Sequence, residues 1–332
     1  MNYRKLKRRS TLAAKTAARV FLGNTLCYLP YVGLIPKPSR KNGISVIIMT
    51  KNEEEWIDLN LQSLKGFADE IVVVDASTDR TPEIIEKTAS RYNLNVKLIH
   101  CKSDQIMGKT KEHAEHSNIA LKNTSFRWVL WWEGDLIAKE SIINFKKEIL
   151  SLNPNIYYTI PLPAVNLEAD IFHQRRDVKL NIESRLNTYS DGLVFEDGGR
   201  FEVLHIPFYY KPIYKYFLRG QYHIFHMVSV KNARKLLFRN FWTDWRELRD
   251  YNKFPKLEDY VMYRIKKDWD IDDVDEAARY YVNRIRCKNL VPYDKERFGE
   301  YPEVLKEELK NPRYKVVYKN GKIIGRNDTL EE

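Results

Sequence analysis

Two carboxylates separated by one glycine, Glu133 and Asp135, follow a tryptophan-rich apolar run that ends at Trp132. Carboxylate oxygens suit Mg²⁺ or Mn²⁺, ions that keep several waters and also bind substrate phosphates. A Glu-Gly-Asp tripeptide by itself is in most proteins only an acidic turn. Its place directly after a buried strand, with two other polar strand ends beside it, favours a metal site.

Polar residues also end two earlier apolar runs. They are Thr50, Lys51, Asn52 and Glu53 after residues 44–49, and Asp75, Ser77 and Asp79 after residues 70–74. The carboxyl ends of parallel strands meet at one sheet edge, where ligands bind in open α/β sheets. We therefore expect one crevice lined by all three groups, and we expect Asn52 to cap the helix that follows it.

These groups need a scaffold, and the alternation of apolar runs and helical patterns supplies one. Strands are predicted near residues 44–49, 70–75, 96–99 and 128–132, with helices between them, the last over 109–123. Such alternation indicates an α/β fold with a mostly parallel, Rossmann-like sheet and flanking helices.

The second half of the sequence is less regular. Strands are predicted at residues 157–160 and 201–204, a mainly helical region from about Asn232, and a hairpin around Asn320-Gly321. We divide the chain into a basic N-terminal segment, an α/β domain and a helical C-terminal extension. Their bounds are 1–42, 43–230 (with a further division into 43–139 and 140–230) and 231–332.

The composition excludes several classes of protein and leaves a question about the N-terminal segment. With 43% hydrophobic and 30% charged residues among 332, the chain is neither disordered nor a polytopic membrane protein. Its net charge is +11, and no acidic residue precedes Glu53. The partly apolar stretch 20–36 is too short and too rich in Gly and Pro to span a bilayer. It either lies on an anionic membrane surface or packs on the core.

Three motifs together resemble the family 2 glycosyltransferases of the GT-A fold. Residues 44–54 (ISVIIMTKNEE) are similar to their opening strand, residues 69–81 (DEIVVVDASTDRT) to their second strand and turn, and residues 128–135 (WVLWWEGD) to the strand that carries their D-x-D metal motif. The resemblance covers residues 43–139 well and continues weakly to about Arg239. Glu133 replaces the usual first Asp, and Ala76 stands where some members have a second Asp.

The resemblance implies that residues 43–230 form a catalytic domain, with a nucleotide-sugar half at 43–139 and an acceptor half at 140–230. It also implies roles for single residues. Thr50, Asn52 and Glu53 would line the nucleotide pocket, and Asp75 would contact the base or ribose. Glu133 and Asp135 would bind Mn²⁺ or Mg²⁺, which bridges the diphosphate of the donor. Where many members have an Arg-Asn pair, this chain has His116-Ser117-Asn118, and we expect His116 to be exposed.

Further residues are candidates for the acceptor side of the reaction. An inverting transferase needs a carboxylate base, and the resemblance offers Asp197 or Glu202, between which the choice stays open with a slight lean to Asp197. His226, rather than His223, fits a third metal ligand. The basic group Lys231, Arg234, Lys235 and Arg239 either neutralises a diphosphate or forms a solvated helix face, which we favour.

The sequence therefore predicts a metal-dependent, inverting glycosyltransferase with a nucleotide-sugar donor and a glycan, lipid-phosphate or protein acceptor. It is expected in the cytoplasm, peripheral on the inner face of a membrane. One alternative is a sugar-nucleotide pyrophosphorylase of related fold, although residues 50–53 lack the Gly-rich signature of those enzymes. A second is a basic nucleic-acid-binding protein, and a third is a degenerate transferase that binds without catalysis.

Overall fold

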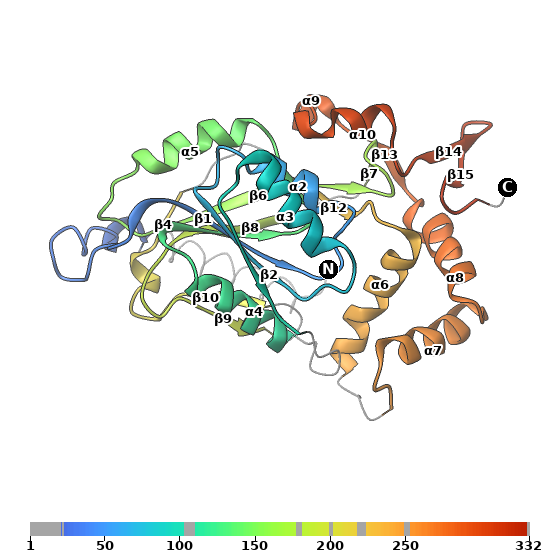
Figure 1. Ribbon diagram of the computed structural model, residues 1–332, viewed down its shortest axis with the longest axis horizontal. Coiled ribbons are helices and arrows are strands. Elements are labelled where there is room, and N and C mark those ends of the chain that lie inside the picture. Colours follow the sequence, from blue (N-terminus) through green and yellow to red (C-terminus); the bar gives the residue numbers. More distant parts are fainter. Residues whose placement is uncertain are drawn as a thin grey trace, which may run out of the picture.

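The computed structural model describes residues 21, 23–102, 110–176, 181–198, 202–217, 224–248 and 253–330. Its centre is a nine-stranded mixed sheet with the strand order β3-β2-β1-β4-β8-β6-β12-β5, in which β11 pairs with β6 (Figure 1). Its strands are β1 Lys41–Thr50, β2 Glu70–Asp75, β3 Val96–His100, β4 Phe126–Glu133, β5 Leu136–Ala138, β6 Tyr158–Glu168, β8 Asn181–Thr188, β11 Lys215–Tyr216 and β12 Ile224–Ser229. Most of the pairings are parallel, so the predicted GT-A-like α/β architecture is confirmed.

The register of the parallel strands brings the polar strand ends together. β1 lies between β2 and β4, and Thr50 is paired with Asp75 while Met49 is paired with Glu133. Helices α2 Ile57–Ser63, α3 Thr81–Tyr92 and α4 Thr110–Lys122 connect the strands in this half. The predicted common edge for the three polar groups is therefore present.

Successive residues of the buried strands face two different cores. Val46, Ile48 and Val73 pack with α2, α3 and α5 (Ser141–Ser151) on one face of the sheet. Ile47 and Val72 pack on the other face, against α4 and the antiparallel pair β9 (Val194–Asp197) and β10 (Glu202–His205). Covering on both faces explains why β1 and β2 are apolar without alternation.

The predicted cap by Asn52 is wrong. Asn52 has a positive φ of 59°, and α2 begins only at Ile57 after a turn. The Asn52 side chain accepts a hydrogen bond from the Thr78 backbone N–H at 2.8 Å. This hydrogen bond ties the end of β1 to the loop after β2. Asparagine suits the position because its short polar side chain tolerates the left-handed backbone conformation.

The C-terminal region is mainly helical, as predicted, and packs on the sheet. Its elements are α6 Ala233–Leu248, α7 Leu257–Trp269, α8 Val274–Tyr281, η2 Val282–Arg286, α9 Lys295–Phe298, η3 Glu303–Leu305, α10 Lys306–Lys310, strand β13 Leu290–Pro292 with its partner β7 His173–Arg175, and the hairpin β14 Val316–Lys319 and β15 Lys322–Arg326. The hairpin turns at Asn320 and Gly321, both at positive φ, which confirms the predicted turn. Phe225 of β12 packs with Tyr293 and Phe298, so the region shares a core with the sheet.

The described part of the N-terminal segment packs on the amino-terminal end of the sheet. Cys27 is fully buried in the core, and Leu26, Leu29 and Ile35 pack beside Tyr210 and Tyr214 of the loop around η1 Lys211–Ile213. No helix among the described residues is long and apolar enough to cross a membrane. The inward side chains of this segment therefore pack on the core, which was one of the two alternatives for it.

Candidate functional site

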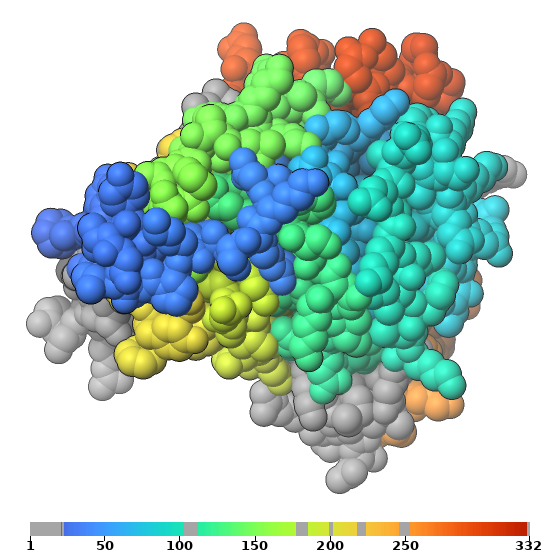
Figure 2. Space-filling view, turned by 60° about the vertical axis from the view of Figure 1, so that its left-hand side comes forward, coloured from blue at the N-terminus to red at the C-terminus, as the bar shows by residue number. Residues whose placement is uncertain are grey.

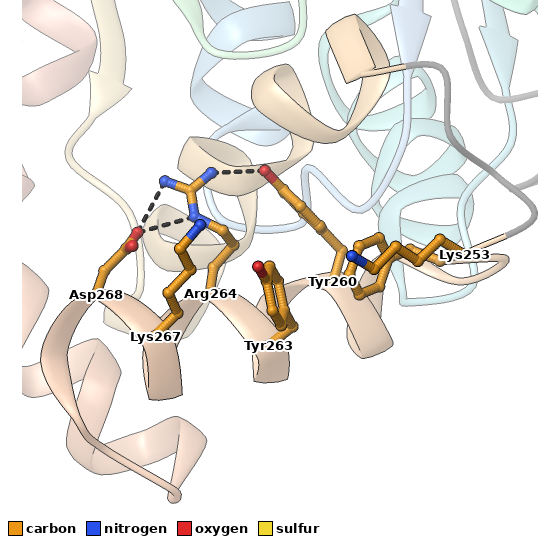
Figure 3. A pocket seen from close by; sticks show the side chains of 7 residues that line it. Lys253, Tyr260, Tyr263, Arg264, Lys267 and Asp268 are labelled. Atoms are coloured by element: carbon orange, nitrogen blue, oxygen red, sulfur yellow. Dashed lines mark hydrogen bonds and ion pairs between the residues drawn. The ribbon is translucent and has the colours of Figure 1, made fainter.

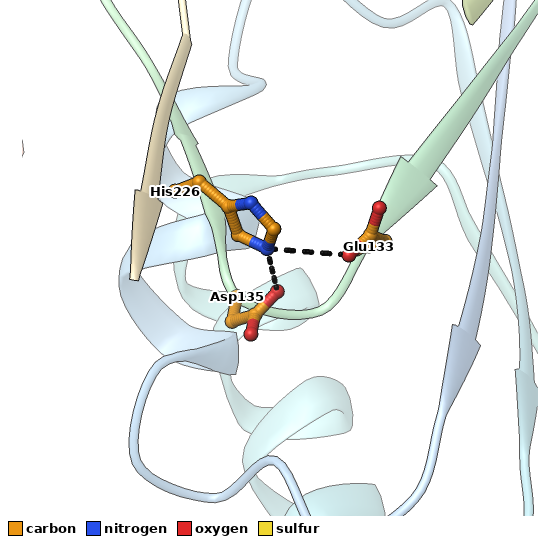
Figure 4. Close-up of side chains that lie close together, drawn as sticks. All are labelled: Glu133, Asp135 and His226. Carbon is orange, nitrogen blue, oxygen red and sulfur yellow. Dashed lines mark ion pairs between the residues drawn. The ribbon is translucent and has the colours of Figure 1, made fainter. Parts of the chain in front are cut away.

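Glu133, Asp135 and His226 converge beyond the carboxyl end of β4 (Figure 4). The Nε2 atom of His226 lies 3.2 Å from Oε2 of Glu133 and 3.3 Å from Oδ1 of Asp135. Neither ring nitrogen of His226 has a hydrogen-bond partner of good geometry in the part of the chain that the structure describes. Two carboxylates and one imidazole, with ligand atoms within 4.8 Å of one another, fit a divalent ion such as Mn²⁺.

The backbone around the cluster is fixed by neighbouring elements. Asn60 of α2 donates from its side chain to the carbonyls of Glu133, at 2.8 Å, and of Leu136, at 2.5 Å. The Met227 N–H of β12 donates to the carbonyl of Asp135 at 2.9 Å. Helix α2 and strand β12 therefore hold the turn between β4 and β5 from two sides, which orients both carboxylates.

Gly134 lies where the end of β1 closely approaches this turn. A methyl group at this position would lie 3.2 Å from Cγ2 of Thr50 and 3.1 Å from Cγ of Glu53. Carbon atoms in contact prefer separations of about 3.5–4.0 Å. The glycine therefore lets the metal turn lie directly against the polar end of β1.

Three basic side chains also contact the acidic cluster. Lys231 Nζ lies 2.6 Å from Oε2 of Glu53 and 2.9 Å from Oδ2 of Asp135, and it is buried. Arg239 Nη1 lies 3.2 Å from the same oxygen of Asp135, and Nη2 of Arg185 donates to Oε1 of Glu133 at 2.8 Å. Each carboxylate that could bind a metal thus shares its charge with a protein cation.

The pKa values of these groups follow from burial and from the cations. Burial raises the pKa of Asp135, but Lys231 and His226 outweigh this effect and hold the pKa well below its usual value. Burial lowers the pKa of His226, but Asp135 and Glu133 outweigh this effect and raise the pKa to about 9. His226 is therefore protonated at neutral pH unless a metal replaces its proton.

With His226 neutral, as metal binding requires, the remaining charges of the site balance. Glu53, Glu133 and Asp135 contribute three negative charges, and Arg185, Lys231 and Arg239 contribute three positive ones. A divalent ion bound here would leave a positive surplus. Such a surplus is complementary to a diphosphate, which carries more than one negative charge.

The predicted nucleotide residues form one hydrogen-bonded group beside this cluster. Thr50 Oγ1 and Ser77 Oγ donate to Oδ1 of Asp75 at 2.8 and 2.6 Å. The Asn52 backbone N–H donates to Ser77 Oγ at 2.7 Å. The carboxylate of Glu53 accepts a hydrogen bond from the ammonium of Lys231. The loops after β1 and β2 are therefore tied into a single hydrogen-bonded wall beside the carboxylate cluster.

The two candidate bases are cross-strand neighbours. Asp197 of β9 pairs directly with Glu202 of β10. Glu202 is half-buried and its carboxylate lies 4.0 Å from Nδ1 of His113, whose ring in turn contacts Trp242 of α6. Asp197 is exposed. Both carboxylates thus lie on the hairpin that packs against α4, on the side where α6 approaches.

The structure corrects the predictions for His116 and for the basic group at 231–239. His116 is half-buried, not exposed, and burial lowers its pKa. We favoured a solvated helix face for the basic group, and this holds for Arg234, whose side chain is 57% exposed. It is wrong for Lys231 and Arg239, which both contact Asp135 in the site. His223 lies outside the described residues.

Sequence reasoning missed the contributions of Arg185 and Asn60, and it undervalued Lys231. Lys231 could have been found by the rule used for the other strands, because it lies two residues beyond the end of β12. Asn60 carries no such signal, since an asparagine within a helix is most often exposed. Its role depends on a contact 73 residues away along the chain.

A separate hollow of about 280 Å³ lies on α7, far along the chain from the carboxylate cluster (Figure 3). Its lining residues are Lys253, Phe254, Tyr260, Tyr263, Arg264, Lys267 and Asp268. Arg264 is already paired with Asp268 and with Asp244. No predicted site residue lines this hollow.

Comparisons with known proteins agree with the motifs at β1, β2 and β4. Residues 45–143 match the family model described as glycosyl transferase family 2. Over 90 residues the chain is 32% identical to the uncharacterised protein MJ0544 of Methanocaldococcus jannaschii, an alignment that covers 27% of this chain and 38% of that protein. The chain thus spans well under half the length of this curated relative.

Solved structures with similar arrangements include the following two. The S. aureus TarS structure of residues 1–349 aligns with a TM-score of 0.40 and 14% identity, covering 85% of this chain and 95% of that chain. Glucosyl-3-phosphoglycerate synthase from Mycobacterium tuberculosis, solved with Mn²⁺, uridine diphosphate and phosphoglyceric acid, aligns with a TM-score of 0.27 and 20% identity, covering 42% and 46%. TM-scores of 0.40 and 0.27 are too low to indicate function.

Proposed function

We propose that this chain, whose residues 45–143 match the family model of glycosyl transferase family 2, moves a sugar, with inversion, from a nucleoside-diphosphate sugar to an acceptor hydroxyl. The observation that carries this proposal is the convergence of Glu133, Asp135 and His226 at the carboxyl edge of the sheet. A divalent ion held by these three residues, Mn²⁺ or Mg²⁺, would supply positive charge to the diphosphate as its bond to the sugar breaks.

Two protein cations complete the leaving-group site in this proposal. Lys231 and Arg239 both contact Oδ2 of Asp135, on the opposite oxygen from His226. A diphosphate placed over Asp135 would contact both cations. Their attraction for the diphosphate would grow as negative charge develops on it in the transition state. Lys231 also contacts Glu53, and we assign to Glu53 the role of holding this ammonium in place.

The nucleoside is assigned to the wall formed by the ends of β1 and β2. Thr50, Asn52 and Glu53 line this wall, and Asp75 lies at its base with its carboxylate hydrogen-bonded to Thr50 and Ser77. A carboxylate so oriented can accept hydrogen bonds from a base or ribose. The division of the chain at residues 43–139, 140–230 and 231–332 stays a proposal, in which α6 of the extension adds Arg239 to the site.

The acceptor hydroxyl needs a base. In the proposed step its oxygen attacks the anomeric carbon, its proton passes to a carboxylate, and the electron pair of the breaking C–O bond leaves with the diphosphate. Asp197 and Glu202 are the candidates. The half-buried position of Glu202 beside His113, whose ring contacts Trp242 of α6, supports Glu202, because Asp197 is exposed.

The acceptor class and the cellular location are separate proposals. The acceptor is a glycan, a lipid-phosphate or another protein. The enzyme itself works in the cytoplasm, on the inner face of a membrane. Three free cysteines, Cys27, Cys101 and Cys287, support a reducing compartment. The basic N-terminal sequence supports a membrane surface.

Calorimetric titration tests the donor site without requiring the acceptor. Nucleoside diphosphates with each common base are titrated into the protein with Mn²⁺ and with EDTA. We expect binding of one nucleotide in the presence of Mn²⁺, at least about tenfold weaker with EDTA or in Asp135→Asn. Arg234→Gln, which changes an exposed arginine of the same helix as Arg239, is the matched control and should bind normally. Failure of every nucleotide to bind would refute the proposed donor site.

A further inference from the structure

Exposed apolar side chains gather at the end of the molecule opposite the metal cluster. They come from the N-terminal segment and from the loop before η1, and we call them the terminal patch: Phe21, Tyr28, Tyr31, Val32, Leu34, Phe208 and Tyr209. Phe208 is 83% exposed, Leu34 73% and Phe21 70%. Figure 2 shows the N-terminal segment in blue beside the yellow segment that contains the loop. Exposed apolar groups in such a cluster mark an interaction surface.

The patch stands on a packed base. Tyr157 of the stretch before β6 donates to the carbonyl of Pro36 at 3.1 Å, and Lys215 Nζ lies 5.9 Å from the centre of the Tyr28 ring. The rings of Tyr209 and Tyr210 lie 4.8 Å apart, and Tyr210 is buried. The N-terminal segment and the loop are therefore fixed to the same region, and their outward side chains present one surface.

The charge around the patch is mostly positive. Lys37 and Lys211 are exposed, Lys215 is half-exposed, and Asp191 is the acidic residue beside Gly192, which approaches Tyr209. The twenty residues that precede Phe21 in the sequence contain seven basic residues and no acidic one. An apolar, aromatic surface flanked by positive charge is the pattern that binds anionic lipid headgroups and inserts shallowly between them.

We propose that the terminal patch docks on an anionic lipid bilayer, with Phe208 and Tyr209 inserted at the interface and Lys37 and Lys211 at the headgroups. Both earlier alternatives for the N-terminal segment then hold at once, because its inward residues pack on the core while its outward residues meet lipid. The occupant is a bilayer rather than a second copy of this chain, since two positively charged patches would repel each other.

Docking in this orientation restricts the acceptor, an inference that rests on the proposed function. The N-terminal segment enters β1 at Lys41, whereas the metal cluster lies at the far ends of β1 and β4. Ten residues of β1 span roughly 33 Å at about 3.3 Å per residue. The site is thus held away from the headgroups, which favours a hydroxyl on a glycan or protein over a group within the lipid layer.

Vesicle co-sedimentation with the full chain tests the docking surface. Vesicles of phosphatidylcholine alone are compared with vesicles that also contain phosphatidylglycerol, at low and high salt. We expect binding to the anionic vesicles only, weakened by salt. Phe208→Ser/Tyr209→Ser should bind at least about tenfold more weakly, since two exposed rings no longer insert. Lys37→Gln/Lys211→Gln should lose a similar factor on anionic vesicles.

The matched control removes exposed apolar groups elsewhere. Met262 and Ile324 are 40% and 44% exposed, on α7 and β15, and Met262→Ser/Ile324→Ser should bind vesicles like the wild type. Equal binding by the two apolar double variants, or equal binding to both kinds of vesicle, would overturn the proposal. So would a dimer of the wild type that Phe208→Ser/Tyr209→Ser abolishes without any vesicle binding. Nucleotide binding with Mn²⁺ is measured on the same samples, so a failed donor site and a failed docking surface give different results.

Discussion

Replacing Lys231 by methionine removes a buried ammonium while keeping most of the side-chain volume. The Lys231 ammonium bridges Glu53 and Asp135, at 2.6 and 2.9 Å. Without it the two carboxylates lose their shared cation inside the protein, and breaking a buried ion pair in this way costs about 3–5 kcal/mol. The loss is expected in full only when no metal is bound, because a divalent ion would itself satisfy Asp135.

The expected shift in melting temperature follows from the size of the protein. At about 2.1 cal/mol/K per residue the unfolding entropy of 332 residues is roughly 0.7 kcal/mol/K, if the chain unfolds as one unit. A loss of about 3–5 kcal/mol then lowers the melting temperature by about 4–7 °C in EDTA. With Mn²⁺ the difference from wild type should shrink, because the metal replaces the missing positive charge.

Thermal denaturation followed by fluorescence or calorimetry measures both effects. Lys235→Met is the matched control, because Lys235 pairs with Glu55 at 3.0 Å but keeps 32% of its side chain exposed. Such an exposed pair contributes about 0–1 kcal/mol, so this variant should melt within about 1 °C of wild type. Equal melting temperatures for the two variants in EDTA would refute the buried bridge at Lys231.

Other variants test the rest of the site. Mn²⁺ affinity should rise about tenfold per pH unit up to pH 9, because His226 must lose the proton that its pKa of about 9 retains, and His226→Gln should flatten this dependence in calorimetry. In the metal-free protein the raised pKa of His226 contributes to the free energy of unfolding. This contribution is fully present below about pH 6.5, the pKa of histidine in the unfolded chain. This contribution should be lost as the pH rises through 9, as chemical denaturation would detect. Gly134→Ala should lower stability by about 1–3 kcal/mol and weaken Mn²⁺ binding, because its methyl group meets Thr50; unchanged values would contradict the close approach. Glu202→Gln should reduce kcat at least about 100-fold with nucleotide affinity unchanged, whereas the same loss in Asp197→Asn alone would transfer the role of base to Asp197.

The sequence was sufficient for the parallel half of the sheet because its strands are buried on both faces and its helices follow in regular alternation. The apolar runs ending at Thr50, Asp75 and Glu133 each coincide with a strand, and the register places their ends together. The family match over residues 45–143 covers the same region. Here local pattern and tertiary structure agree.

Features that depend on contacts between distant residues could not be read from the pattern. Asn52 has the residue type of a helix cap, yet its side chain accepts a hydrogen bond from Thr78 in the loop after β2. Lys231 belongs to a basic run that resembles a solvated helix face, but it lies between β12 and α6, where its ammonium contacts Asp135. Arg185 reaches Glu133 because β8 lies beside β4 in antiparallel register. In each case a partner far along the chain decides the role.

Cleavage of nucleotide-sugars by the purified protein tests the central claim most directly. A panel of donors that differ in base and sugar is incubated with Mn²⁺, and release of the nucleoside diphosphate is measured for wild type, Asp135→Asn and the exposed control Arg234→Gln. The account predicts release from at least one donor by wild type and by Arg234→Gln, abolished by EDTA and lowered at least about 100-fold in Asp135→Asn. Release by Asp135→Asn at the wild-type rate would contradict it.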